Sequence, residues 1–251
     1  MKIAISGKGG VGKTTIMALL ARQLQASGRE VLIIDADPSP HMAETLGLKK
    51  VGSITPIAEM KKLLAERAEK TEGSPFYQLN PKVDDILTDF LIEENGYKLM
   101  VLGAIQSGDS GCACPESHVL RKILKKLMLT AKQVVLLDME AGVEHLGRGT
   151  VAGADHLLIV VIPSRSSIRT ALKIKKLAQD VGIPKISFVG NLVEDDDDRT
   201  FMINGLGEEP LAFFPNSSTL RRAERDEEPI INIDDRLGGA PEQLMEKLLA
   251  E

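Results

Sequence analysis

The residues best suited to chemistry stand near the start of the chain, in the segment Gly7-Lys8-Gly9-Gly10-Val11-Gly12-Lys13-Thr14. This segment matches the phosphate-binding pattern G-x-x-x-x-G-K-[ST], and it follows an apolar run and opens a helical pattern. Glycines let backbone N–H groups turn toward phosphate oxygens, Lys13 supplies charge to the β- and γ-phosphates, and the Thr14 hydroxyl reaches Mg²⁺. We therefore predict a nucleotide site with these binding residues: Gly9, Gly10, Val11, Gly12, Lys13, Thr14 and Thr15.

Acidic side chains end two further apolar runs. Asp138 follows the run Val134–Leu137, which is how an acid is presented to the water shell of Mg²⁺. Asp35 and Asp37 close another run, and the carboxyl ends of parallel strands face the ligand, so two acids there suit a cation or a water molecule. A turn formed by Asp37 and Pro38 is the alternative interpretation.

Two more residues extend the predicted nucleotide site. Gly142, four residues after Asp138, can offer its amide to the γ-phosphate. Asn191 ends another apolar run, and an Asn amide can pair with the edge of adenine. Leu192 and Glu194 stand where the guanine motif N-K-x-D needs Lys and Asp, so the sequence favours ATP over GTP.

The cysteines, Cys112 and Cys114, form a C-x-C pair just before Pro115. Proline fits the first turn of a helix, and a helix N-terminus favours the thiolate form of a nearby cysteine. One pair supplies two ligands, whereas a closed thiolate site takes four, which a two-fold dimer would complete. Two buried small hydrophobic side chains, a strained disulfide, or a single-chain site with His118 as third ligand are the alternatives.

The elements that must position these residues alternate along the chain. Buried Val/Ile/Leu runs separated by helical patterns predict an α/β fold with a mostly parallel sheet and helices on both faces. Strands are expected at Lys2–Ser6, Glu30–Asp35, Lys98–Gly103, Lys132–Asp138, His156–Ile162, Lys185–Gly190 and Glu209–Phe214, and helices at Lys13–Ala26, Glu116–Leu129, Ser166–Val181 and Pro241–Ala250. We expect a single domain over residues 1–251, with an insertion at about 50–97 that includes an amphipathic segment, Ile57–Lys70. The acidic block Glu194–Asp198 is expected to be a solvated loop.

Composition narrows the functional classes. The chain has 251 residues, of which 43% are hydrophobic and 27% charged, close to the globular norm, so disordered and fibrous classes are excluded. No apolar run approaches the ~18 residues of a membrane helix, and a cytoplasmic location is expected. The net charge is −5, with no Trp and only two Tyr, which argues against a nucleic-acid partner.

Lys8 carries a resemblance to a known class. The run Lys8–Thr15 resembles the variant phosphate loop of the MinD/ParA/nitrogenase iron-protein class of ATPases. The resemblance implies that Lys8 reaches across a dimer interface to the partner's nucleotide, whereas the residues alone would leave it a solvated lysine. It also implies that Asp37 orients the attacking water, making Lys8, Lys13 and Asp37 the catalytic residues, and that Asp35 supports the magnesium site of Thr14 and Asp138.

Two further segments, Gly111–Glu116 and Asp138–Thr150, resemble the CooC-type nickel-insertion ATPases that mature carbon monoxide dehydrogenase. The likeness spans nearly the whole chain, although Gln106–Ser110 replaces the glycine-rich lead-in of that family. It implies a homodimer that closes on ATP, binds Ni²⁺ or Zn²⁺ through paired Cys112 and Cys114, and loads nickel into the apo-enzyme.

Three alternatives remain open at this point. A relative that serves acetyl-CoA synthase shares these motifs, and an iron–sulfur carrier would use the same cysteines for a cluster. A MinD/ParA-like partitioning ATPase would need a basic amphipathic tail or a DNA-binding surface, but the tail Gln243–Glu251 is poor in positive charge. An iron–sulfur protein would be brown, whereas a nickel or zinc chaperone would be colourless.

Overall fold

The computed structural model describes residues 1–37, 39–49, 55–67, 84–103, 115–130, 133–139, 153–233 and 237–250. Within these ranges the core is an eight-stranded sheet with the order β3-β4-β2-β5-β1-β6-β7-β8. The pairs are parallel except at one edge, where β3 runs antiparallel to β4. The predicted α/β fold with a mostly parallel sheet is therefore confirmed.

The strands are built from the apolar runs of the sequence. Their bounds are β1 (Lys2–Gly7), β2 (Val31–Ala36), β3 (Ile92–Glu94), β4 (Tyr97–Val101), β5 (Val134–Met139), β6 (His156–Val161), β7 (Lys185–Val193) and β8 (Phe213–Pro215). Every residue of β2, β5 and β6 is buried, because helices cover both faces of these central strands. No helix in the described ranges is long and apolar enough to cross a membrane.

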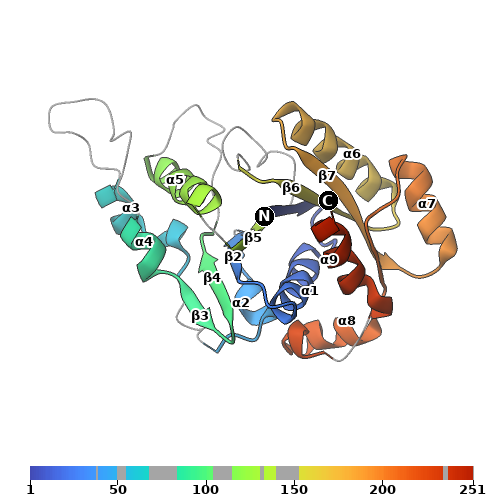
Figure 1. Ribbon diagram of the computed structural model, residues 1–251, viewed down its shortest axis with the longest axis horizontal. Helices are drawn as coiled ribbons and strands as arrows, with labels where there is room; N and C mark the ends of the chain where they lie inside the picture. The colour runs from blue at the N-terminus through green and yellow to red at the C-terminus, as the bar shows by residue number, and fades with distance from the viewer. Residues whose placement is uncertain are drawn as a thin grey trace.

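Helices cover the sheet in two layers (Figure 1). One face packs against α1 (Lys13–Ala26), α2 (Met42–Thr45), α8 (Ser218–Arg225), α9 (Ala240–Ala250) and the 3₁₀ turns η4 (Ile230–Asn232) and η5 (Leu237–Gly239). The other face packs against α3 (Lys61–Arg67), α4 (Asp84–Asp89), α5 (Pro115–Thr130), α6 (Arg165–Asp180), α7 (Asp196–Leu206) and the 3₁₀ turn η2 (Ile57–Glu59). Successive strand residues point to opposite faces, so that Ile3 and Ile5 belong to the first layer and Ala4 to the second.

The acidic block does not form the loop expected of it. Residues 196–198 are the first turn of α7, and the Asp195 side chain caps the helix by accepting a hydrogen bond from the Asp198 N–H at 2.9 Å. Carboxylates are favourable at a helix N-terminus, because the free N–H groups and the helix dipole are positive there. The block is solvated as expected, but its charge starts a helix.

The expected insertion at 50–97 is described in part. Ile57, Leu64 and Ile86 are each 1% exposed and belong to the core beside α5. The segment ends in β3, which the sequence analysis missed and which extends the sheet at its edge. Ten of the fourteen residues of the amphipathic stretch expected here form η2 and α3, and residues 68–70 lie outside the described ranges.

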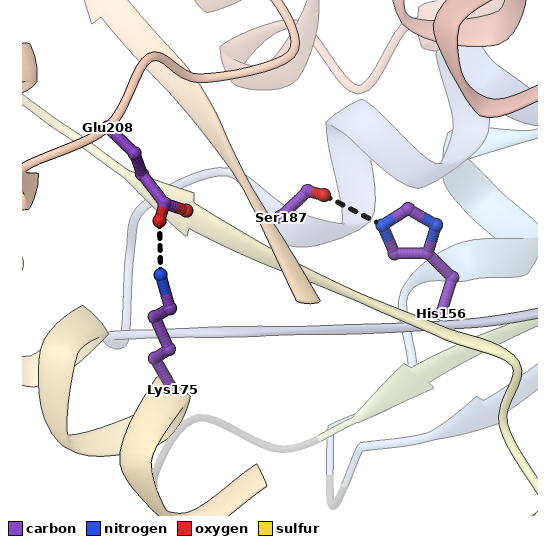
Figure 2. A network of polar contacts seen from close by, with 4 residues as sticks. All are labelled: His156, Lys175, Ser187 and Glu208. Carbon is purple, nitrogen blue, oxygen red and sulfur yellow. Dashed lines mark hydrogen bonds and ion pairs between the residues drawn. The ribbon is translucent and has the colours of Figure 1, made fainter. Parts of the chain in front are cut away.

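Polar contacts connect the β6–α6–β7–α7 unit (Figure 2). His156 of β6 and Ser187 of β7 lie 2.9 Å apart, from ring Nε2 to hydroxyl oxygen. Lys175 of α6 forms an ion pair with Glu208, just after α7, and its ammonium lies 5.2 Å from the centre of the Phe188 ring. These contacts join β7 to β6 and α6 to β7, the two elements whose residues Ser166 and Asn191 contact the phosphate loop.

Candidate nucleotide and magnesium site

The phosphate loop follows β1, a central strand, at the carboxyl edge of the sheet. Gly10 and Gly12 have φ values of +75° and +86°, a conformation that glycine adopts without strain. Helix α1 begins directly after Gly12, and the Ile16 N–H donates to the Gly12 carbonyl at 3.0 Å as its first turn closes. The loop thus brings together the free N–H groups of a helix N-terminus and the buried Lys13 (8% exposed), a combination that suits an anion such as phosphate.

Two acids and a hydroxyl meet beside this loop. Asp35 and Asp138 are opposite each other in the pairing of β2 with β5, and each is 1% exposed. The Thr14 hydroxyl donates to Asp138 Oδ2 at 2.7 Å. Among the described residues, Asp138 Oδ1 has no hydrogen-bond partner although it is buried. A buried carboxylate oxygen without a donor, next to a second acid and a threonine hydroxyl, is a set of hard oxygen ligands that fits Mg²⁺.

Burial changes the protonation of both acids. Desolvation, with a further contribution from the charge of Asp35, raises the pKa of Asp138 to about 7, while the Thr14 hydrogen bond and Lys13 oppose the rise. Desolvation raises the pKa of Asp35 to about 6, while the hydrogen bonds from the Met42 and Asp37 N–H groups oppose it. Two like charges this close in the interior cost free energy, so the pair favours either a shared proton or a bound cation.

Asp37 occupies the loop that follows β2. Its N–H donates to Asp35 Oδ1 at 3.1 Å, and its own Oδ1 accepts from the Ser39 N–H at 2.9 Å. The second contact is a local Asx turn, so the side chain is held in the turn conformation that was the alternative interpretation. Its half-buried carboxylate still lies next to the Asp35 end of the site.

Lys8 lies on the outer side of the phosphate loop. The side chain is exposed, and its Nζ donates to the Ser166 hydroxyl at 3.0 Å. Ser166 stands in the first turn of α6, whose N-cap Ser164 accepts from the Ser167 N–H at 3.2 Å. Ser166 was missed in the sequence analysis, although a serine-rich stretch after the β6 run is the usual signal for a helix start at this edge.

Asn191 reaches the phosphate loop from the end of β7. Its Nδ2 donates to the backbone carbonyl of Val11 at 2.8 Å, and the residue is 8% exposed. The proposed pairing with adenine stays a prediction, since the amide contacts the loop itself in this structure. The remaining site residues expected from sequence, Gly142, Cys112 and Cys114, lie outside the described ranges.

In the parts of the chain that the structure describes, no group of three or more His, Cys, Asp and Glu side chains forms a metal site of its own. The acids near the phosphate loop are the buried pair Asp35 and Asp138, with the Thr14 hydroxyl beside Asp138 and Asp37 beside Asp35.

The parallel sheet, the glycine-rich loop and the buried acids define a nucleotide-binding protein of the P-loop class. The sequence matches the model of the CobQ/CobB/MinD/ParA nucleotide binding domain over residues 2–230, and the chain belongs to this family.

Individual relatives agree with this assignment. The carbon monoxide dehydrogenase accessory protein CooC of Rhodospirillum rubrum is 40% identical over 230 residues, which cover 90% of this chain and 87% of CooC. An ATP-binding protein of Methanocaldococcus jannaschii is 38% identical over 259 residues, covering 99% and 98% of the two chains. The septum site-determining protein MinD of Pyrococcus horikoshii, solved with Mg-ADP, has the same fold, with a TM-score of 0.70, 21% identity and coverage of 100% and 98%.

Proposed function

We propose that the protein is an ATP-hydrolysing, dimeric metallochaperone that inserts nickel into apo carbon monoxide dehydrogenase. The observation that carries the proposal is the 40% identity with the accessory protein CooC over nearly the full length of both chains. The cysteine pair supports it, because Cys112 and Cys114 supply soft ligands that a nucleotide site does not need.

The ATPase part of the proposal rests on the described site. Lys13 and the loop N–H groups of residues 9–15 bind the phosphates, assisted by Gly142. Thr14 and Asp138, supported by Asp35, would hold Mg²⁺, which supplies positive charge to the phosphate oxygens when bound. Asp37 positions the attacking water and Asn191 contacts the adenine base. Binding of Mg-ADP to MinD of the same fold supports this choice of ligand.

The dimer part of the proposal rests on Lys8. Its exposed ammonium stands at the rim of the loop and is held only by a neutral hydroxyl, Ser166, among the described residues. In the dimer Lys8 leaves this partner and contacts the phosphates bound by the other subunit. A charged phosphate is a stronger partner for an ammonium than a hydroxyl is, so the exchange is favourable.

The cargo part of the proposal rests on sequence. Each chain contributes two thiolates, so two chains give the four ligands of a tetrahedral Ni²⁺ or Zn²⁺ site, at one ion per dimer. Metal binding should weaken as the pH falls, because protons compete with the metal for the thiolates. Nickel is the cargo of the reaction, and the ATP cycle changes the dimer that holds it.

The test combines metal stoichiometry with maturation of the client. We expect one tightly bound Ni²⁺ per dimer in calorimetry, loss of tight binding in Cys112→Ser and in Cys114→Ser, and wild-type binding in the neighbouring control Ser110→Ala. Apo carbon monoxide dehydrogenase incubated with the protein, Ni²⁺ and ATP should gain activity, and the Cys variants should not support this.

Other results would point to other functions. A brown protein that contains iron and sulfide would make it a cluster carrier. Activation of apo acetyl-CoA synthase alone would change the client. ATP-dependent binding to anionic vesicles or to DNA, without metal binding, would make it a partitioning ATPase.

A further inference from the structure

The hydrogen bond between Asn191 and Val11 joins residues that are 180 positions apart in the chain. It connects the end of β7 to the middle of the phosphate loop, and both residues are buried, at 8% and 1% exposed. Recognition of adenine alone would not require this hydrogen bond, because the amide could instead point toward the nucleotide. The bond therefore indicates that Asn191 also acts on the loop itself.

The backbone of β7 is distorted where it presents this amide. Its pairing with β8 shifts register between Gly190 and Val193, so that Asn191 and Leu192 lie in a bulge. Leu192 has a φ of +55°, in the left-handed region that costs a leucine free energy. The strand is anchored just before the bulge, where the Gly190 N–H donates to the Ala212 carbonyl at 2.9 Å. Bulges commonly redirect a side chain near a site, and this one aims Asn191 at the loop.

Gly12 is fitted to the same amide. A Cβ at this position would lie 2.4 Å from Asn191 Nδ2, closer than atoms of these types approach. Any side chain at position 12 would thus displace the amide and break its hydrogen bond to Val11. The Asn191 amide therefore packs against Gly12 in the space that a side chain at position 12 would occupy.

The carbonyl of Val11 belongs to the same planar peptide unit as the N–H of Gly12. In a trans peptide these two groups point in opposite directions, so fixing the oxygen toward Asn191 fixes the N–H toward the other side of the loop. A loop that is held before the ligand arrives loses less conformational entropy on binding.

We propose that Asn191 is a positioning residue for phosphate binding, which holds the Val11–Gly12 peptide so that its N–H faces the phosphates. This inference rests on the proposed ATP-binding function and deepens it. An Asn amide has two N–H hydrogens and one carbonyl oxygen, so the bond to Val11 leaves one hydrogen and the oxygen for a base. The same side chain then connects recognition of the base to the shape of the phosphate cradle.

The test uses a ligand without a base. Calorimetry measures the affinity of the full chain for Mg²⁺ with inorganic tripolyphosphate and, separately, with ATP. Asn191→Ala should weaken the binding of both ligands about five- to tenfold, since one buried neutral hydrogen bond is lost. The control Asn216→Ala, directly after β8, removes an amide that bonds Glu194 at 2.9 Å and not the phosphate loop, and it should change neither affinity. If Asn191→Ala weakens ATP alone and leaves tripolyphosphate unchanged, Asn191 acts on the base only and the proposal is wrong.

A double-mutant cycle tests the contact independently of any ligand. The cost of Gly12→Ala is measured by urea unfolding in the wild type and in Asn191→Ala. Strain from the positive φ of residue 12 is common to both backgrounds and cancels. Gly12→Ala should destabilise the wild type more than the Asn191→Ala background, where the methyl group has room. If Gly12→Ala lowers the free energy of unfolding equally in both backgrounds, Asn191 does not hold the loop through this contact. This result is independent of ATP binding, so it can be read even if the proposed function is wrong.

Discussion

Asp35 and Asp138 are direct register partners on adjacent parallel strands, and each carboxylate is buried at 1% exposure. Both side chains therefore point to the same face, toward the N-terminus of α1, where Thr14 bonds Asp138. The sheet forces the two acids together, and the folded protein accepts the electrostatic cost at the place where a divalent cation would relieve it.

The first prediction concerns this pair and pH. In the absence of metal, the stability of the wild type should fall as the pH rises from about 4 to about 7. Folded Asp138 keeps its proton up to a pKa of about 7, whereas the unfolded chain loses it near 3.8, so the folded state binds more protons in this window. Asp138→Asn should reduce the dependence to the part that comes from Asp35, and it should stabilise the metal-free protein at pH 7.5 by on the order of 2–4 kcal/mol.

Urea unfolding in EDTA between pH 4.5 and pH 8 measures this effect. Asp180→Asn, at the exposed end of α6, is the matched control and should follow the wild type. If Asp138→Asn retains the wild-type slope, the pH dependence arises elsewhere. Added Mg²⁺ should release protons from the wild type, because cation and proton compete for the same oxygens.

The second prediction separates binding from hydrolysis. Lys13→Ala should weaken ATP binding at least tenfold, because it removes a charged partner of the phosphates. Asp37→Ala should keep ATP affinity within about threefold and lower the hydrolysis rate about a hundredfold or more, since it removes water positioning and leaves the loop intact. Calorimetry and a phosphate-release assay measure the two quantities. Wild-type turnover in Asp37→Ala would show that the Asx turn is the whole role of this residue.

The third prediction concerns the Lys8–Ser166 contact. Lys8→Ala should leave the nucleotide affinity of the single chain nearly unchanged but weaken the ATP-dependent dimer, because the ammonium serves the partner's nucleotide. Ser166→Ala should leave the dimer as tight as in the wild type or tighter, since it frees Lys8. Sedimentation with a non-hydrolysable ATP analogue measures both, with Lys173→Ala on the exposed side of α6 as control. If Lys8→Ala forms the ATP-dependent dimer as tightly as the wild type, Lys8 is a solvated lysine with no role in the dimer.

The fourth prediction addresses the capped start of α7. Asp195→Ala should destabilise the protein by about 1 kcal/mol, because the Asp198 N–H loses its acceptor. Asp197→Ala, in the same turn but not at the capping position, should cost only about 0.3 kcal/mol through the helix dipole. Equal effects in thermal unfolding would mean that the block acts through net charge alone.

The fifth prediction follows if one dimer binds both nucleotide and metal. Nucleotide should then tighten Ni²⁺ binding by the same factor by which Ni²⁺ tightens nucleotide binding. Calorimetry of each ligand with and without the other gives the two factors. In Cys112→Ser the nucleotide affinity should persist while the coupling disappears. If nucleotide leaves Ni²⁺ binding unchanged or weakens it in the wild type, the two ligands do not stabilise the same dimer.

Most of the described fold could be predicted from the sequence, because many of its elements have a regular apolar pattern and end at glycine or proline residues. The bounds expected for α1, Lys13–Ala26, are the bounds observed, since a glycine-rich loop and a regular apolar pattern define its ends. Helix α8 was missed because it buries only Ala223 among charged residues, so that its pattern resembles a loop. The short edge strand β3 was missed for a similar reason, since three residues, Ile92–Glu94, carry too little periodicity.

The site was predictable where a residue ends a buried run. Asp35, Asp138 and Asn191 were selected in this way, and parallel strands bring the ends of such runs to one edge. The contact of Asn191 with the loop was not predictable, because it depends on a bulge after Gly190, and the left-handed Leu192 leaves no signal in a sequence. The contact between Lys8 and Ser166 likewise depends on the path of β6 into α6.

The central place of β1 also has a consequence for how the protein is made. Its two neighbours are β5 and β6, and the N–H of its first residue, Lys2, donates to the carboxylate of Asp155, 153 positions further along the chain. On the ribosome β1 must therefore wait until β6 has emerged before both of its edges are covered. Such distant pairings slow folding and leave the strand exposed in the meantime. Because the phosphate loop directly follows β1, the ability to bind nucleotide should arise late in synthesis, and nascent chains that stop before β6 should lack it.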